Sequence, residues 1–127
     1  MDKINLAALF DPFVRRYSIG VNSTERFRAS FLSAYNSAIM DLYSWSALSE
    51  EPEMVTDTDG ESMLEVKYLP ILNTGIGHFL QKESEWVKGE ARDEYSELNW
   101  IRAKGNACSI KIDAIEEAGN FGPWGTN

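Results

Sequence analysis

The sequence predicts a mainly α-helical fold: a small bundle of three or four helices with an acidic loop, minor short strand content and an extended C-terminal arm. Three observations predict it. Apolar residues recur at steps of three and four over the long segments, which is the period of a helix buried on one face. Acidic residues crowd one segment between two of these stripes. The last nine residues carry glycine and proline at a spacing that no helix can cross.

The size of the chain fits one domain. Its 127 residues and 43% hydrophobic content are enough for a single modest core. We expect residues 1–22 to form an N-terminal helical extension, residues 23–118 the helical core and residues 119–127 the arm. There is no apolar run of ~18 residues that would indicate a membrane span, and a secretory signal is not expected. One cysteine, Cys108, excludes an internal disulfide and fits a reducing compartment.

Two helices are expected before the acidic segment. A short apolar pattern over residues 6–17 predicts an N-terminal helix, which Pro12 either kinks or divides. The next helix is predicted over residues 23–46, where apolar side chains form one stripe. Asn22 stands at its N-cap and Glu25 follows three residues later, which is the spacing of a capping box. This helix should end near the start of the acidic segment.

The acidity of the chain is local. The formal net charge is −8, and residues 49–66 alone hold seven acidic residues and no basic one. Such a chain is not expected to bind nucleic acid through a broad basic face. The segment either docks on a basic surface of a partner protein or is a solvated loop that keeps the protein soluble. Its candidate interface residues are Glu50, Glu51, Glu53, Asp57 and Asp59.

A short extended piece is expected at residues 63–68, followed by a helix over residues 68–83 with Pro70 in its first turn. Gly75 and Gly77 begin like a dinucleotide-binding loop. That loop needs a third glycine and a preceding strand, which this segment lacks, so we reject a nucleotide site. Since a glycine in a helix interior costs about 0.8–1.0 kcal/mol relative to alanine, at least one should permit close contact with a neighbouring helix or subunit. Gly75 is the candidate.

The third strong helical segment covers residues 89–106, with Gly89 and Gly105 at its ends. Acidic residues occupy its predicted solvent face. Its predicted inner stripe consists of Ala91, Tyr95, Leu98 and Ile101 or Arg102. Beyond it, the sequence alternates briefly at Ile110 and Ile112, as a short strand does, and then turns helical.

We find no catalytic, metal-binding or cofactor-binding constellation, and we predict that the chain is not an enzyme. His78 is the only histidine, which excludes a site with several histidines and favours a role at a helix boundary or interface. Cys108 is expected to be a small buried side chain. In the acidic run around Gly60, an EF-hand alignment places valine at the first and twelfth ligand positions, so a calcium loop is excluded.

Large aromatic side chains fall at the ends of the predicted elements. Trp45 and Trp86 either cap the edge of a small core or anchor a protein interface. Phe121 and Trp124 lie in the arm, where helical periodicity cannot fold them into a core. Either they pack locally or a neighbouring protein receives them.

Three segments together resemble the head–tail connector, or adaptor, proteins of tailed bacteriophages. They are FLSAYNSAIMDL, YLPILNTGIGHFL and EYSELNWIRA. The resemblance covers about residues 27–107. The matching positions are Ala34, Asn36 and Ala38 in one helix, Tyr68, Leu72 and Gly75 in the next, and Tyr95 and Arg102 in the last.

This resemblance implies a helical virion protein without cofactor or enzyme activity, made in the cytoplasm of the bacterial host. It implies a ring, usually of twelve copies, between the portal and the next neck or tail protein, which extends the channel for the genome. Such a ring needs head-to-tail contacts that close by rotation, and an acidic lining would let DNA pass without binding. The alternative is a small acidic binding module, such as an immunity or antirestriction protein that imitates DNA. That module would need its acids spread along a face.

Overall fold

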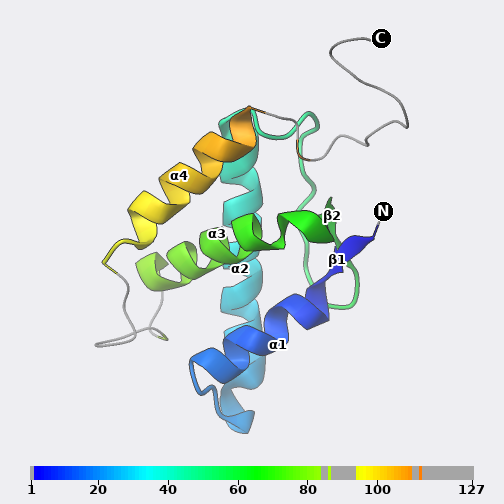
Figure 1. Ribbon diagram of the computed structural model, residues 1–127. Helices are drawn as coiled ribbons and strands as arrows, with labels where there is room; N and C mark the ends of the chain where they lie inside the picture. Colours follow the sequence, from blue (N-terminus) through cyan, green and yellow to red (C-terminus); the bar gives the residue numbers. More distant parts are fainter. Residues whose placement is uncertain (1, 84–85, 87–93, 110–111, 113–127) are drawn as a thin grey trace.

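The computed structural model describes residues 2–83, 86, 94–109 and 112. Most of these residues are helical. The helices are α1 (Leu6–Arg16), α2 (Thr24–Ser44), α3 (Leu69–Glu83) and α4 (Ser96–Cys108) (Figure 1). The smaller elements are two strands, β1 (Lys3–Asn5) and β2 (Glu61–Glu65), and two 3-10 helices, Val21–Ser23 and Val66–Tyr68. The predicted mainly helical fold with short strand content is therefore confirmed.

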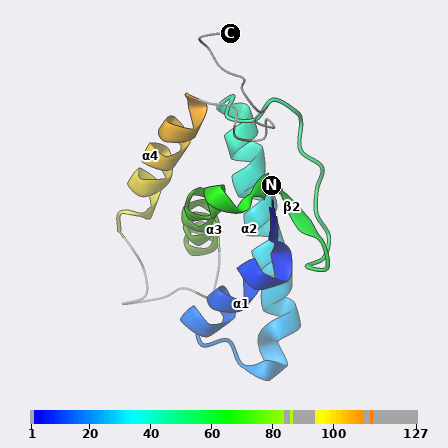
Figure 2. The ribbon, with the colours of Figure 1, turned by 45° about the vertical axis from the view of Figure 1, so that its right-hand side comes forward.

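The long helix α2 is the centre of the arrangement. Helix α3 lies across it and packs against both α2 and α4, while α1 lies beside the N-terminal half of α2 (Figure 1). In both views, α4 and the β1–β2 ribbon lie at opposite sides of the α2–α3 pair (Figures 1 and 2). The molecule therefore has one edge made by a helix and another made by a ribbon.

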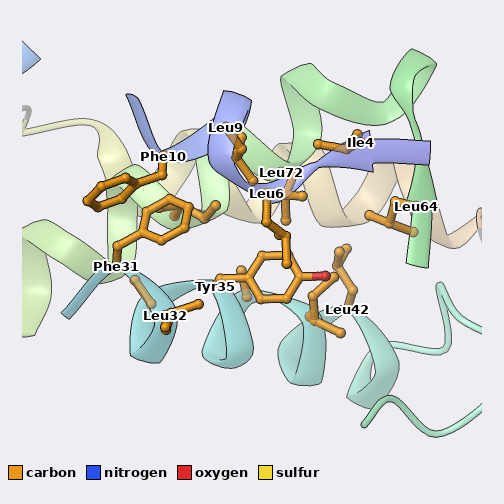
Figure 3. Packing of buried hydrophobic residues seen from close by; sticks show 14 of the residues in the cluster. Ile4, Leu6, Leu9, Phe10, Phe31, Leu32, Tyr35, Leu42, Leu64 and Leu72 are labelled. Atoms are coloured by element: carbon orange, nitrogen blue, oxygen red, sulfur yellow. The ribbon is translucent and has the colours of Figure 1, made fainter. Parts of the chain in front are cut away.

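One hydrophobic cluster joins these elements. Figure 3 shows side chains of α1 facing side chains of α2, and the Phe10 and Phe31 rings meet edge to face with centroids 5.1 Å apart. Leu64 from β2 and Leu72 from α3 enter the same cluster. Since Phe10 and its neighbours on α1 are buried there, the N-terminal residues pack inside the core rather than beside it.

The start of α2 differs from the prediction. Ser23, not Asn22, is the N-cap, and its side chain makes no capping hydrogen bond. The 3-10 helix Val21–Ser23 leads directly into α2, so Asn22 already lies inside helical backbone and cannot serve as the cap. Glu25 pairs instead with Arg28, at 3.2 Å between carboxylate and guanidinium. The predicted capping box is therefore wrong.

The end of α2 is where the sequence predicts it, with Trp45 as C-cap. The Ala47 N–H donates to the Leu42 carbonyl at 2.9 Å, the long bond of a Schellman motif. The motif needs a left-handed residue, and Ser46 takes that position with φ 68°. Helix α1 ends in the same way with Ser18 at φ 55°, and it runs through Pro12 without dividing.

The extended piece predicted at residues 63–68 overlaps β2 only up to Glu65, because Val66–Tyr68 form a 3-10 helix instead. The partner of β2 is the N-terminal strand β1, which sequence reasoning missed. The strands are antiparallel, with Lys3 opposite Glu65 and Asn5 opposite Glu61. The Asn5 side chain then accepts a hydrogen bond of 2.9 Å from the Ala8 N–H and caps α1. The ribbon therefore fixes the position at which the first helix begins.

The predicted inner face of the last helix is wrong. Tyr95, Leu98 and Ile101 are 64%, 43% and 42% exposed, and Arg102 is also exposed. The face that packs on the core consists instead of Trp100, Lys104 and Ala107. Trp100 is 1% exposed, and its indole N–H donates to the Asp41 carboxylate at 2.7 Å, so the large ring is buried with its polar atom satisfied. Gly105 lies inside α4 rather than at its end; Gly89 and Ala91 are outside the described residues.

Candidate protein interfaces

Gly75 lies where three helices meet. A Cβ atom placed on it would be 2.7 Å from two ring carbons of Trp100 and 3.0 Å from the Cβ of Ala38. By contrast, a Cβ on Gly77 would have no atom within 4 Å among the neighbouring elements. The predicted close contact at Gly75 is therefore confirmed, and it joins α3 to α2 and α4 of the same chain.

Trp86 lies at the edge of the core. Its ring meets Phe27 edge to face, with centroids 5.4 Å apart, and its indole N–H donates to the Ser30 hydroxyl at 2.9 Å. The Arg26 guanidinium covers the ring at 4.5 Å from its centroid. These contacts account for the half-buried side chain within one subunit.

A buried polar cluster attaches α4 to α2. One carboxylate oxygen of Asp41 accepts from the Trp100 indole N–H at 2.7 Å and from the Lys104 ammonium at 2.8 Å. Lys104 is only 6% exposed, and its ammonium also lies 4.2 Å from the centre of the Trp45 ring. Trp45, one of the predicted interface residues, is 40% exposed and therefore packs on the cluster while it keeps one face at the surface.

Sequence reasoning missed this cluster, although two signals for it were present. Asp41 interrupts the apolar stripe of α2 directly before Leu42, and Lys104 follows Trp100 by one helical turn. A charge inside an apolar stripe usually has a buried partner of opposite sign.

His78 and Cys108 have structural contacts. The Nδ1 atom of His78 lies 3.2 Å from the Ser96 hydroxyl and links α3 to the first turn of α4. Burial lowers the pKa of this imidazole below 6.5, and the Lys82 ammonium lowers it further. The Cys108 thiol is half-buried and donates to the Trp45 carbonyl at 3.0 Å. Within the described residues, no three histidine, cysteine or acidic side chains are grouped as metal ligands.

The acidic loop is attached to α2 at fixed points. The Asn36 side chain makes two hydrogen bonds of 2.9 Å with the backbone of Val55, one as donor and one as acceptor. Farther along, the Arg28 guanidinium donates to the Thr58 hydroxyl at 2.6 Å. The sequence signal for this attachment was Asn36, because this polar residue stands among buried positions of α2. Ala34 and Tyr35 precede it and Ala38 follows it.

These attachments create an acidic groove of about 560 Å³. Its floor includes Tyr35 and Ile39 of α2, and the Tyr35 hydroxyl donates to Ser62 at 2.8 Å. Three of the five predicted acidic residues line it, namely Glu50, Glu51 and Glu53. The other two are exposed in a turn, where the Asp59 N–H donates to the Asp57 carboxylate at 2.9 Å.

The outer side of α4 carries an apolar stripe, which we call the α4 outer stripe. Its apolar residues are Tyr95 at the N-cap and Leu98 and Ile101 on the helix, and Arg102 and Gly105 lie beside them. All are exposed. At about 100° per residue, the centre of the stripe lies about 145° from the direction midway between Trp100 and Lys104, on the side of the helix away from the core. Single exposed apolar residues are ordinary, whereas a contiguous set is typical of an interaction surface.

A second groove, which we call the apolar groove, lies between the ribbon and the starts of α1 and α3 and has a volume of about 370 Å³. Its apolar lining residues are Ile4, Ala8, Leu9, Val66 and Leu69. Charged and polar residues at its border are Asp2, Lys3, Asn5 and Glu61. Val66 is 49% exposed, so part of this apolar lining faces solvent.

Phe121 and Trp124, and with them the predicted C-terminal arm, lie outside the described residues. Within the part that the structure describes, every helix is too short or too polar to cross a membrane. Comparison with known proteins gives no match, whether to family models, to curated proteins or to solved structures.

Proposed function

We propose that the chain is a structural virion protein without enzyme activity that forms a ring adaptor between the portal and the neck or tail of a tailed bacteriophage. The sequence resemblance to connector proteins suggests this function, and a small helical fold is compatible with it. The observation that carries the proposal is the α4 outer stripe. Three exposed large apolar side chains follow one another at steps of three residues, Tyr95 at the N-cap and Leu98 and Ile101 on the helix, and such a group is typical of a surface that binds another protein.

The energetic argument concerns Leu98 and Ile101. Each leaves about two fifths of its surface in water, at 43% and 42%. Full burial of such a side chain is worth ~1.5–3 kcal/mol, so burial of the remaining part contributes about 1 kcal/mol per residue. In a ring this gain repeats at every subunit, which favours a closed assembly over the single chain.

The acidic loop supplies a second property that an adaptor requires. Because Asn36 holds the loop backbone on α2, Glu50, Glu51 and Glu53 occupy a defined place on each subunit. A ring of about twelve copies repeats this charge around its axis. A ring of acidic side chains repels the phosphates of DNA, so genomic DNA passes without specific binding.

The C-terminal arm is proposed to dock onto the portal or a neighbouring subunit through Phe121 and Trp124. Deletion of residues 119–127 should leave the melting temperature nearly unchanged but prevent incorporation into particles. Infectious particles that contain the truncated chain would show that the arm has no such role.

Imaging by negative-stain electron microscopy tests the function directly. The protein co-expressed with a portal protein and a downstream neck protein should appear as a ring on the portal. The Leu98→Glu variant should remain folded by circular dichroism and fail to form the ring. If the wild-type chain stays monomeric beside the portal and instead binds a nucleic-acid enzyme, the acidic binding module is the correct function.

A further inference from the structure

We infer that the α4 outer stripe of one copy binds in the apolar groove of a second copy, in a head-to-tail contact. The inference rests on the proposed function, because it names the contact that would close the ring. It commits to a second copy of this chain as the occupant of both surfaces.

The first argument is placement. Helix α4 and the ribbon lie at opposite sides of the α2–α3 pair (Figures 1 and 2). The outer stripe also faces away from Trp100 and Lys104, which pack inward. One copy therefore cannot bring its own stripe to its own groove. Two different surfaces at opposite sides of a subunit generate a heterologous assembly, which forms a closed ring when the rotation between copies allows.

The second argument is shape and apolar character. Leu98 and Ile101 form a ridge on α4, and Gly105 on the same side leaves space, since a Cβ there would meet no atom within 4 Å. The groove has Ile4 and Leu9 as buried lining residues and the half-exposed Val66 beside them. A ridge of two aliphatic side chains in an apolar groove is the usual way in which a helix docks on a protein.

The third argument is charge. Arg102 is exposed within the outer stripe, and the border of the groove carries the exposed carboxylates Asp2 and Glu61. Among the described residues at this border the one cation is Lys3, whose ammonium donates to the Met63 carbonyl at 2.8 Å, so the border keeps a net negative charge. A stripe placed in a groove brings opposite charges together. Electrostatic complementarity between Arg102 and these carboxylates therefore supports the head-to-tail contact.

The test uses two variants that each disrupt one surface. Leu98→Arg destroys the stripe and leaves the groove, and Val66→Arg destroys the groove and leaves the stripe. Both positions are exposed, so circular dichroism should show unchanged folding. Sedimentation velocity should show concentration-dependent oligomers for the wild type. Each variant alone should associate at least about tenfold more weakly.

The decisive sample is an equal mixture of the two variants. It should form a complex of two chains and stop there, because each variant keeps one intact surface and only one productive contact is possible. Met54→Arg is the matched control, since Met54 is a 53% exposed apolar residue outside both surfaces, and this variant should assemble as the wild type does. A mixture that stays monomeric, or single variants that assemble like the wild type, would overturn the inference.

The outcomes also separate this inference from the adaptor function. If the wild type and both variants form rings on the portal, the contact is wrong and the function stands. If the mixture pairs as expected but the wild type forms no ring on the portal, the contact stands and the function is wrong. Wild-type protein that forms neither oligomers nor rings refutes both. As an independent check, Arg102→Glu should weaken association and Glu61→Arg should restore it.

Discussion

Gly75→Ala tests the packing of the three helices most directly. The added Cβ would lie 2.7 Å from two ring carbons of Trp100 and 3.0 Å from the Cβ of Ala38. The indole cannot move aside easily, because it is 1% exposed and its N–H is bonded to Asp41 at 2.7 Å. The change therefore forces α3 away from one of its neighbours.

Two effects of opposite sign set the magnitude. Alanine is favoured over glycine in a helix interior by about 0.8–1.0 kcal/mol. Overpacking a filled core costs about 1–3 kcal/mol. Because the added Cβ would make two contacts below 3.0 Å, we expect the cost of Gly75→Ala to lie toward the upper end of that range. We expect a net loss of about 1–2 kcal/mol. The control is Gly77→Ala two residues away, where a Cβ meets no atom within 4 Å and only the gain of about 0.5–1 kcal/mol remains.

Urea unfolding followed by tryptophan fluorescence measures the difference. The two alanine variants should be separated by about 1.5–3 kcal/mol, or by roughly 6–12 °C in thermal midpoint at about 4 °C per kcal/mol. Gly75→Leu, which adds three more carbons to the same position, should lose more than Gly75→Ala. If Gly75→Ala is as stable as Gly77→Ala, the close contact at Gly75 does not limit the core and the packing argument is refuted.

Three further predictions follow from the polar contacts. Asn36→Ala removes both hydrogen bonds to the acidic loop. Limited proteolysis should therefore cut between residues 50 and 58 faster than in the wild type, while the helical circular dichroism signal is unchanged. Equal cleavage rates would contradict the attachment of the loop by Asn36. Asp41→Ala leaves the Lys104 ammonium buried without its partner, so it should lower the free energy of unfolding by about 3 kcal/mol. Lys104→Met removes the buried charge itself and should lower it by less than about 1 kcal/mol. Equal losses in urea unfolding would show that burial of the charge is not the cause. Burial lowers the pKa of His78, so below pH 6.5 the unfolded chain binds a proton at this residue more readily than the folded chain does. The free energy of unfolding therefore has its full value above pH 6.5 and declines as the pH falls below it. His78→Gln should remove this decline below about pH 6.5, and an unchanged pH profile of the urea midpoint would contradict it.

The sequence determined the features that depend on neighbours along the chain. Helices α2 and α3 have one apolar stripe each, and their positions follow from that stripe. The close contact at Gly75 was also predictable, because a glycine inside a helix costs stability unless small size is needed there. The rejection of a nucleotide loop followed from the same helical periodicity, and α3 includes both glycines.

Long-range pairing was decided only by the tertiary structure. The β1–β2 ribbon joins residues about sixty positions apart, and three residues of β1 carry too little pattern to identify a partner. Likewise, the two bonds of Asn36 to the loop depend on the path by which the chain returns past α2. Neither contact has a local signature, since both are set by where the rest of the core places the backbone.

The face of α4 is the clearest example of this division. Its sequence offers two faces that can be buried, one with Tyr95, Leu98 and Ile101 and one with Trp100 and Lys104. Periodicity favours the first because it has more apolar residues. The fold buries the second, because Gly75 on α3 leaves space for the indole and Asp41 on α2 binds both the indole N–H and the ammonium. The sequence by itself determined that α4 is a helix, and only packing against α2 and α3 decided which of its faces remains for a partner.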